Sequence, residues 1–273
     1  MVSCPLKMRV CRATLQSVHS ALTFGVGNWG DVERRRRPAP NDSAARCESS
    51  RAGSCMAISG KHSWIENSDV FSLFPTLAWK IQLRAEGQES IDASVLGLLD
   101  SLRQGQPALK TGEAWQSGHG LHRREELQEL CDCVRRAAAS VLQFLKTSDE
   151  TIEITGCWAN LYAPGAAHPM HSHPNNYLSA VYYVRTWPGA DSINFHDPRS
   201  QTGVIRPPVT ELTAANADQV VVRVRNGTLL VFPSYLCHSV DANASGETRT
   251  SVSFNLMYSA FTEALSKPMW GDD

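Results

Sequence analysis

The feature that most restricts the fold of this chain is a change of hydrophobic period near residue 150. Before that point, apolar residues recur at helical spacing within 91–102 and 127–145. After it, short apolar segments are separated by Pro, Gly and Asn, as strands are. Such a change predicts an α+β protein in which antiparallel strands form a sandwich or small barrel and the helices pack outside. The expected strands are 151–162, 177–185, 192–196, 219–225, 228–232 and 249–258, and a short apolar strand entry is expected within 71–83.

The same pattern divides the 273 residues into four parts: 1–55, a helical part 56–150, a β-core 151–262 and a tail 263–273. Residues 1–55 carry nine Lys or Arg against four Asp or Glu, while residues 1–30 contain no acid at all. This composition is typical of an organelle transit segment; a disordered leader, or a true start at Met56, are the alternatives. We therefore expect a cytoplasmic protein, or a mitochondrial or plastid one if 1–55 is a transit segment.

The composition argues against several classes of protein. The net charge is −1 and no basic stripe occurs, so no nucleic-acid partner is expected. No stretch reaches the roughly 20 apolar residues of a membrane-spanning helix, so no membrane association is expected. The eight cysteines lack zinc or disulfide spacing, and free thiols are the simplest interpretation.

A pair of histidines, His171 and His173, precedes the expected strand 177–185. Imidazoles at positions i and i+2 of an extended chain point to one face, so both can reach the same metal ion. Because Leu178, Val181 and Tyr183 of the following strand are expected to be buried, the pair is predicted to lie at the rim of the core. His168 and His196 are expected to be surface or satisfied core residues.

A third histidine, His238, follows the apolar segment 228–232 and lies where that strand leaves the core. The turn residues 241–246 then reverse the chain. If this hairpin closes symmetrically, His238 faces Arg249 on the returning strand, with Cβ atoms about 5 Å apart. The prediction is a third metal ligand side by side with a fixed positive charge.

Along the expected strand 249–258, polar residues alternate with apolar ones, and Arg249, Ser251, Ser253 and Asn255 share one face. A solvated face is the commoner explanation of such alternation. However, an Arg followed by a hydroxyl two residues on offers a guanidinium fork and one extra donor, which suits a carboxylate. Arg249 and Ser251 are therefore the expected anion-binding residues.

Several motifs occur in one order along the chain, and together they carry a family resemblance. Residues from about Phe71 to Ala260 resemble a family of 2-oxoglutarate/Fe(II)-dependent oxygenases. The matching segments are Phe74-Pro75-Thr76, Trp115-Gln116-Ser117, His171-Ser172-His173-Pro174-Asn175, 178–183, Asp197-Pro198-Arg199, 232–236 with His238, and Arg249-x-Ser251-x-Ser253-Phe254-Asn255.

The resemblance implies a double-stranded β-helix with N-terminal helices packed outside. It implies Fe(II) held at the mouth by His171, His173 and His238, and 2-oxoglutarate with its far carboxylate on Arg249 and Ser251. It also implies a dioxygenase reaction that consumes 2-oxoglutarate and O₂, releases succinate and CO₂, and hydroxylates a substrate that the sequence does not identify.

This chain has His173 where the wider superfamily has Asp or Glu. Three neutral imidazoles leave the ferrous centre one charge more positive. A water, Asp191 or Asp197 are alternatives for the third ligand, although the shared face favours His173. Two other functions remain open. One is a three-histidine cupin-type dioxygenase that does not use 2-oxoglutarate, and the other is a non-catalytic β-sandwich with a closed four-ligand metal shell.

Overall fold

The computed structural model describes residues 69, 71–147, 151–199, 207–213 and 215–262. The chain divides into two units, Met1–Thr76 and Leu77–Asp273, and all that follows concerns the described residues of the second. The predicted leader 1–55 and tail 263–273 lie outside the described residues. No helix in the described part of the chain is long and apolar enough to cross a membrane.

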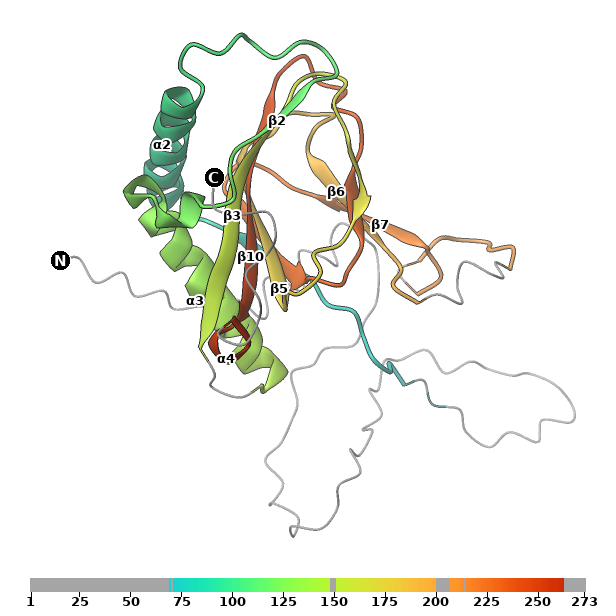
Figure 1. Cartoon of the computed structure of the whole chain (residues 1–273). Helices are drawn as coiled ribbons and strands as arrows, with labels where there is room; N and C mark the ends of the chain where they lie inside the picture. Colours follow the sequence, from blue (N-terminus) through green and yellow to red (C-terminus); the bar gives the residue numbers. More distant parts are fainter. Residues whose placement is uncertain (1–68, 70, 148–150, 200–206, 214, 263–273) are drawn as a thin grey trace, which may run out of the picture. The chain divides into compact units, whose positions relative to one another are not determined.

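Two antiparallel sheets form the body of the second unit (Figure 1). The large sheet has six strands in the order β1-β8-β5-β10-β3-β2, and the small sheet has four in the order β4-β9-β6-β7. The large-sheet strands are β1 (Trp79–Gln82), β2 (Ala114–Gln116), β3 (Ile152–Tyr162), β5 (Leu178–Arg185), β8 (Thr228–Pro233) and β10 (Arg249–Tyr258). The small-sheet strands are β4 (His168–His171), β6 (Ser192–His196), β7 (Gln219–Arg223) and β9 (His238–Val240). The expected α+β class and double-stranded β-helix are confirmed.

The side chains of β5 are buried on both faces, because the large sheet lies between the helices and the small sheet (Figure 1). Ala180, Tyr182 and Val184 belong to the outer core, which includes the buried helix residues. Val181 and Tyr183 point the other way and pack with the small sheet. The inner core consists of Val181, Tyr183, Ile193, Phe195, Val224, Leu230, Phe232 and Leu236. The space between the two sheets is therefore where an internal site can form.

Two long helices cover the outer face of the large sheet (Figure 1). They are α2 (Ala85–Leu102) and α3 (Gln128–Leu145), and a short helix, α4 (Ser259–Thr262), follows β10. The buried residues of α2 are Ile91, Val95, Leu98 and Leu99; they and the partly buried Leu102 are the residues whose spacing predicted the helix. Cys131, Cys133, Cys157 and Cys237, the cysteines within the described residues, are free.

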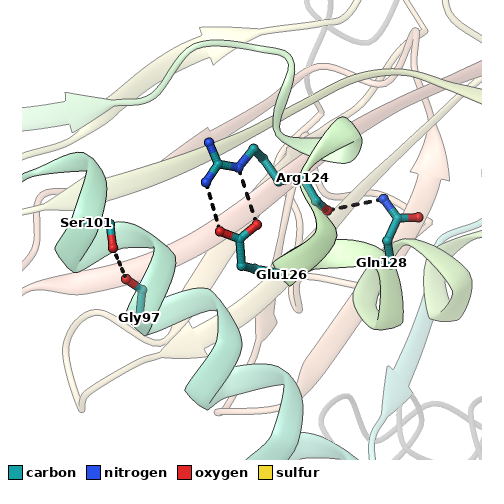
Figure 2. Close-up of polar contacts among 5 residues, drawn as sticks. All are labelled: Gly97, Ser101, Arg124, Glu126 and Gln128. Atoms are coloured by element: carbon teal, nitrogen blue, oxygen red, sulfur yellow. Dashed lines mark hydrogen bonds and ion pairs between the residues drawn. The ribbon is translucent and has the colours of Figure 1, made fainter.

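The entry into α3 is built from two short 3₁₀ turns, η1 (Leu121–Arg123) and η2 (Glu125–Leu127). Figure 2 shows the polar contacts there: Arg124 donates from Nε and Nη2 to the two carboxylate oxygens of Glu126, at 3.3 and 2.8 Å. The Gln128 side chain donates to the carbonyl of Arg124 at 3.2 Å. In α2, Ser101 bonds back to the carbonyl of Gly97. The contacts of Arg124, Glu126 and Gln128 are exposed and stabilise the turn that leads into α3.

The predicted hairpin between His238 and Arg249 is wrong, because β9 and β10 belong to different sheets. β10 pairs over its length with β3 and β5, with Arg249 opposite Tyr162, and this long pairing outweighs a local hairpin. The segment between β9 and β10 is held in place by Asn243, which is buried. Its Nδ2 donates to the carbonyls of Tyr162 and Glu247, at 2.9 and 2.7 Å. Three short strands, β2, β4 and β9, were not predicted.

Candidate metal centre

Three histidines converge between the ends of β4 and β9. The two strands pair antiparallel, and His171 lies directly opposite His238. His173 follows two residues later, where its backbone N–H donates to the carbonyl of Ser234 at 2.9 Å. One ligand atom from each imidazole lies within 4.8 Å of the other two. The structure thus brings together the three histidines that the sequence singled out, in an arrangement that could hold one metal ion.

Backbone carbonyls fix the orientation of two of these rings. Nδ1 of His171 lies 2.9 Å from the carbonyl of Pro169, and Nδ1 of His238 lies 2.9 Å from the carbonyl of Leu236. Because a carbonyl can only accept, Nδ1 carries the proton in each ring and the lone pair is on Nε2. Metal-binding histidines are commonly oriented in this way, so the donor set fits a divalent transition metal such as Fe(II).

The environment keeps the imidazoles of His173 and His238 neutral. Burial, with neighbouring histidines as a smaller cause, lowers the pKa of His173 to about 3. Burial likewise lowers the pKa of His238 to about 4. Both rings are therefore unprotonated at neutral pH, which is the form that binds a metal.

The metal-free protein should lose stability as the pH falls below neutrality. The unfolded chain protonates His173 and His238 near the ordinary pKa of 6.5, whereas the folded values are about 3 and about 4. Between these values the unfolded state binds more protons, so the free energy of unfolding is fully retained above 6.5 and falls as the pH drops toward 4. Urea unfolding across this range measures the fall, which should be smaller in His173→Gln; an equal fall in that variant would contradict the assignment.

His168 is hydrogen-bonded, as expected of a satisfied residue, but it also lies in the neighbourhood of the metal-binding histidines, which the sequence did not predict. Its Nδ1 lies 2.7 Å from the hydroxyl of Tyr162, and its ring centroid is 4.2 Å from that of His171. A register shift between His168 and His171 in β4 accompanies this approach, and such an irregularity cannot be read from the sequence. His196, by contrast, bonds Ser239 at 2.9 Å, as a satisfied residue does.

Arg249 is buried between the two sheets, with 3% of its surface exposed. Its Nη1 donates to the carbonyl of Ser192 at 3.0 Å, and its guanidinium carbon lies 5.1 Å from the ring centroid of Tyr183. The Nε of Arg249 and the hydroxyl of Tyr183 are both buried and neither has a partner in good hydrogen-bond geometry, although the phenol lies close enough to the guanidinium to interact with it. Burial raises the pKa of Tyr183 to about 12, so the phenol keeps its proton and can donate. Two unpartnered donors beside a buried cation fit a bound anion.

Ser251 adds a third polar side chain beside Arg249 and Tyr183 in the space between the two sheets. It is 3% exposed and lies opposite Asn160 on β3 and Tyr183 on β5. The polar face of β10 therefore points inward, and the alternative of a solvated face is wrong. Sequence reasoning placed Tyr183 among the buried strand residues, and nothing in the sequence marks its hydroxyl as a possible donor to a ligand.

An aromatic side chain from β3 borders the histidines on another side. The Trp158 ring centroid lies 5.6 Å from that of His173 and 4.8 Å from that of His119, which precedes η1. Trp115, in the same connecting segment as His119, packs instead against the outer core. The segment before η1 thus reaches the site through His119.

The two carboxylates considered as alternative ligands are engaged elsewhere. Asp191 accepts from Arg223 at 2.7 Å, and Asp197 accepts from Arg199 at 2.7 Å. Among the described residues, the metal-binding group consists of the three histidines alone. A group of three differs from the closed four-ligand shell of a structural site.

Comparisons with known proteins agree with this geometry. Residues 156–255 match a family model described as "Putative 2OG-Fe(II) oxygenase". No curated protein sequence matches the chain. Among solved structures, the non-haem alpha-ketoglutarate-dependent carbocyclase SnoK from nogalamycin biosynthesis is similar over 72% of this chain and 90% of its own, at 15% identity and a TM-score of 0.50.

Two further structures are similar at slightly lower TM-scores. HygX from Streptomyces hygroscopicus, solved with nickel and 2-oxoglutarate bound, has a TM-score of 0.49 at 15% identity, with 67% of this chain and 83% of HygX covered. A prolyl hydroxylase from Trichoplax adhaerens has a TM-score of 0.48 at 16% identity, with 70% and 87% covered. At such identities the SnoK similarity establishes the shared fold, and the family match covers the segment that contains all three histidines.

Proposed function

We propose that this chain, a 2OG-Fe(II) oxygenase by the family of its residues 156–255, holds Fe(II) through His171, His173 and His238 and binds 2-oxoglutarate through Arg249 and Ser251. The observation that carries the proposal is the position of two unpartnered buried donors, Arg249 Nε and Tyr183 O–H, in the interior that the histidines border. We propose hydroxylation of an organic substrate as the reaction, with one O₂ and one 2-oxoglutarate consumed per succinate, CO₂ and hydroxyl group formed.

In this reaction the protein positions the metal ligands and the co-substrate, and it excludes water from them. Iron, when bound, supplies the redox chemistry that couples 2-oxo acid oxidation to substrate oxidation. The carbonyls of Pro169 and Leu236 hold two imidazoles with Nε2 available. Arg249 offers a fixed charge in a place from which water is largely excluded, where an ion pair is stronger than at the surface. Tyr183 and Ser251 offer neutral donors beside it.

The histidine at position 173 gives the centre a distinct charge balance. A ferrous ion with three neutral imidazoles keeps two positive charges, and a doubly charged 2-oxoglutarate would neutralise them. With Arg249 counted as well, the three-histidine complex carries one positive charge and a complex with a carboxylate ligand would carry none. What favours the 2-oxoglutarate-dependent alternative over the cupin-type one is therefore the buried Arg249, for which the cupin-type alternative offers no role.

The direct test is spectroscopic. Anaerobic addition of Fe(II) and then 2-oxoglutarate should produce the weak visible charge-transfer band of a chelated 2-oxo acid, and oxygen should then discharge it with release of succinate. Absence of the band in protein that still binds iron tightly would favour the three-histidine cupin-type enzyme or the structural metal site.

Tyr183→Phe should weaken 2-oxoglutarate binding by about tenfold or more, because a hydrogen bond to a charged group contributes about 1.5–3 kcal/mol and 1.4 kcal/mol corresponds to a factor of ten. Titration of the anaerobic band measures this dissociation constant. Tyr182→Phe is the matched control, since the Tyr182 hydroxyl donates to Asp92 at 2.8 Å in the outer core. Equal effects of the two substitutions would rule out a specific role for Tyr183.

A further inference from the structure

We propose that the primary substrate presents a neutral hydrogen-bonding group, an amide or a hydroxyl, to Asn255. The receiving surface, called here the neutral strip, consists of Gly156, Trp158, Ser179, Ser253 and Asn255. The inference rests on the proposed function, because it assumes that the three histidines hold the reactive metal. It adds the substrate class, which neither the fold nor the family match specifies.

Strand register places these residues side by side on the inner face of the large sheet. On β3 and β10, Trp158 lies opposite Ser253 and Gly156 opposite Asn255; on β5, Ser179 also lies opposite Asn255. Directly opposed residues share a face. The inner face of β10 thus begins with Arg249 and Ser251 and continues with the neutral strip, so its charged end and its neutral end are separate.

The neutral strip lies against the metal centre. The Trp158 ring is 5.6 Å from that of His173, centroid to centroid. Ser179 shares a hydrogen bond of 2.8 Å with Ser234, whose carbonyl accepts from the backbone of His173 at 2.9 Å. A substrate group bound on this strip is therefore next to His173, where an adjacent C–H bond can reach the metal.

The inward residues directly beside the strip carry no charge; the next inward pair beyond Asn255 and Gly156 is Met257 with Glu153, which is exposed. The inward residues of β3, β5 and β8 beside the strip are Asn160, Val181, Leu230 and Phe232. An unpaired ion buried among such residues would lose its hydration without compensation. An anion can bind to Arg249 at the other end of β10, whereas the neutral strip suits an uncharged group.

Asn255 is the residue with unfulfilled hydrogen-bonding capacity. Its Oδ1 is buried without a partner, and no described residue bonds its amide nitrogen. Asn160, which lies on β3 opposite Ser251, has partners for both ends of its side-chain amide. Its Oδ1 accepts from Gln116 at 3.0 Å, and its Nδ2 donates to Ser253 at 3.0 Å. A side-chain amide both donates and accepts, so its natural complement is a group that does the same, such as an amide or a hydroxyl.

Gly156 leaves space beside Asn255. A methyl group there would stand 3.6 Å from Cζ3 of Trp158 and 3.8 Å from Nδ2 of Asn255, which are ordinary van der Waals distances. Gly156→Ala should therefore fold normally and narrow this space. We expect it to weaken substrate binding and so to provide a steric probe independent of Asn255.

The experiment measures succinate release by the iron-loaded full chain in the presence of a defined panel of small compounds. The neutral members are N-acetylated amino acid amides and methyl glycosides; the charged members are the same amino acids with a free carboxylate and the corresponding amino sugars. We expect at least one neutral compound, and no charged one, to stimulate release tenfold or more.

The stimulation should be lost in Asn255→Leu and reduced in Gly156→Ala. Asn176→Ala, which removes an exposed amide bonded to Thr155, is the control expected to respond as wild type.

A second readout separates function from stability. Removing an unpartnered buried oxygen should leave the thermal midpoint of Asn255→Leu at or above that of wild type. Stimulation by charged members, no stimulation by any neutral member, an undiminished response in Asn255→Leu or a lowered midpoint would each overturn the inference. Asn255→Asp, which keeps the shape and adds a charge, should also lose the response. A wild-type protein without the iron–2-oxoglutarate band would refute the proposed function itself.

Discussion

Arg249→Ala is expected to weaken 2-oxoglutarate binding by about 100-fold or more while iron binding persists. Loss of one partner of a buried charge pair typically costs about 3–5 kcal/mol, and 1.4 kcal/mol corresponds to a factor of ten. The effect should be large here because Arg249 is 3% exposed and the carbonyl of Ser192 already orients it. Titration of the anaerobic charge-transfer band gives the 2-oxoglutarate dissociation constant. Calorimetric titration with Fe(II) measures the affinity for iron.

Two further variants make this result specific. Arg249→Lys keeps the charge but loses the guanidinium fork, so its affinity should fall between those of wild type and Arg249→Ala. Arg223→Ala removes an arginine that pairs at the surface with Asp191, and it should bind 2-oxoglutarate as wild type does. If Arg249→Ala retained normal affinity, Arg249 would not be the co-substrate anchor and the far carboxylate would have to bind elsewhere.

His238→Ala is expected to reduce Fe(II) affinity by more than about 100-fold, because loss of an outer-shell partner alone costs 10–100-fold and this change removes a proposed ligand. His238 is buried, its pKa is lowered to about 4, and its Nδ1 is engaged by Leu236, so its Nε2 has no described role other than metal binding. Anaerobic calorimetry with Fe(II), or the visible spectrum with Co(II), measures the change.

His196→Ala is the matched control for His238→Ala. Its imidazole also lies in the small sheet, but it bonds Ser239 and does not belong to the metal-binding group. We expect its iron affinity to equal that of wild type. Normal iron binding by His238→Ala would disprove the ligand assignment, and an equal loss in both variants would indicate that the sheet rather than the ligand had been damaged.

Much of the fold was predictable because hydrophobic period is a local property. The helix around Leu127–Leu145 and the long strands at 151–162 and 249–258 were predicted close to their observed bounds, whereas the helix predicted from Ile91 to Leu102 begins at Ala85. Short strands escaped prediction: β4 and β9 owe their existence to pairing with each other, and three or four residues carry too weak a pattern to be recognised.

The candidate site was predictable in its members more than in its geometry. The three histidines and Arg249 were identified by residue type and order, yet the symmetric hairpin gave the wrong neighbour for His238. The contributions of Tyr183 and His168 could not be predicted, because both depend on which strands meet across the interior. An unpartnered hydroxyl and a register shift are properties of the assembled fold.

The four inward polar positions of β10 make this strand unequally tolerant of different kinds of mutation. Arg249, Ser251, Ser253 and Asn255 alternate with Val252, Phe254 and Leu256, which face the helices. Exchanging one polar residue would alter one contact, whereas inserting or deleting a single residue before Ser251 would turn the row outward and bring bulky apolar groups inside. Divergence within such a strand should therefore proceed by substitution, with its length preserved.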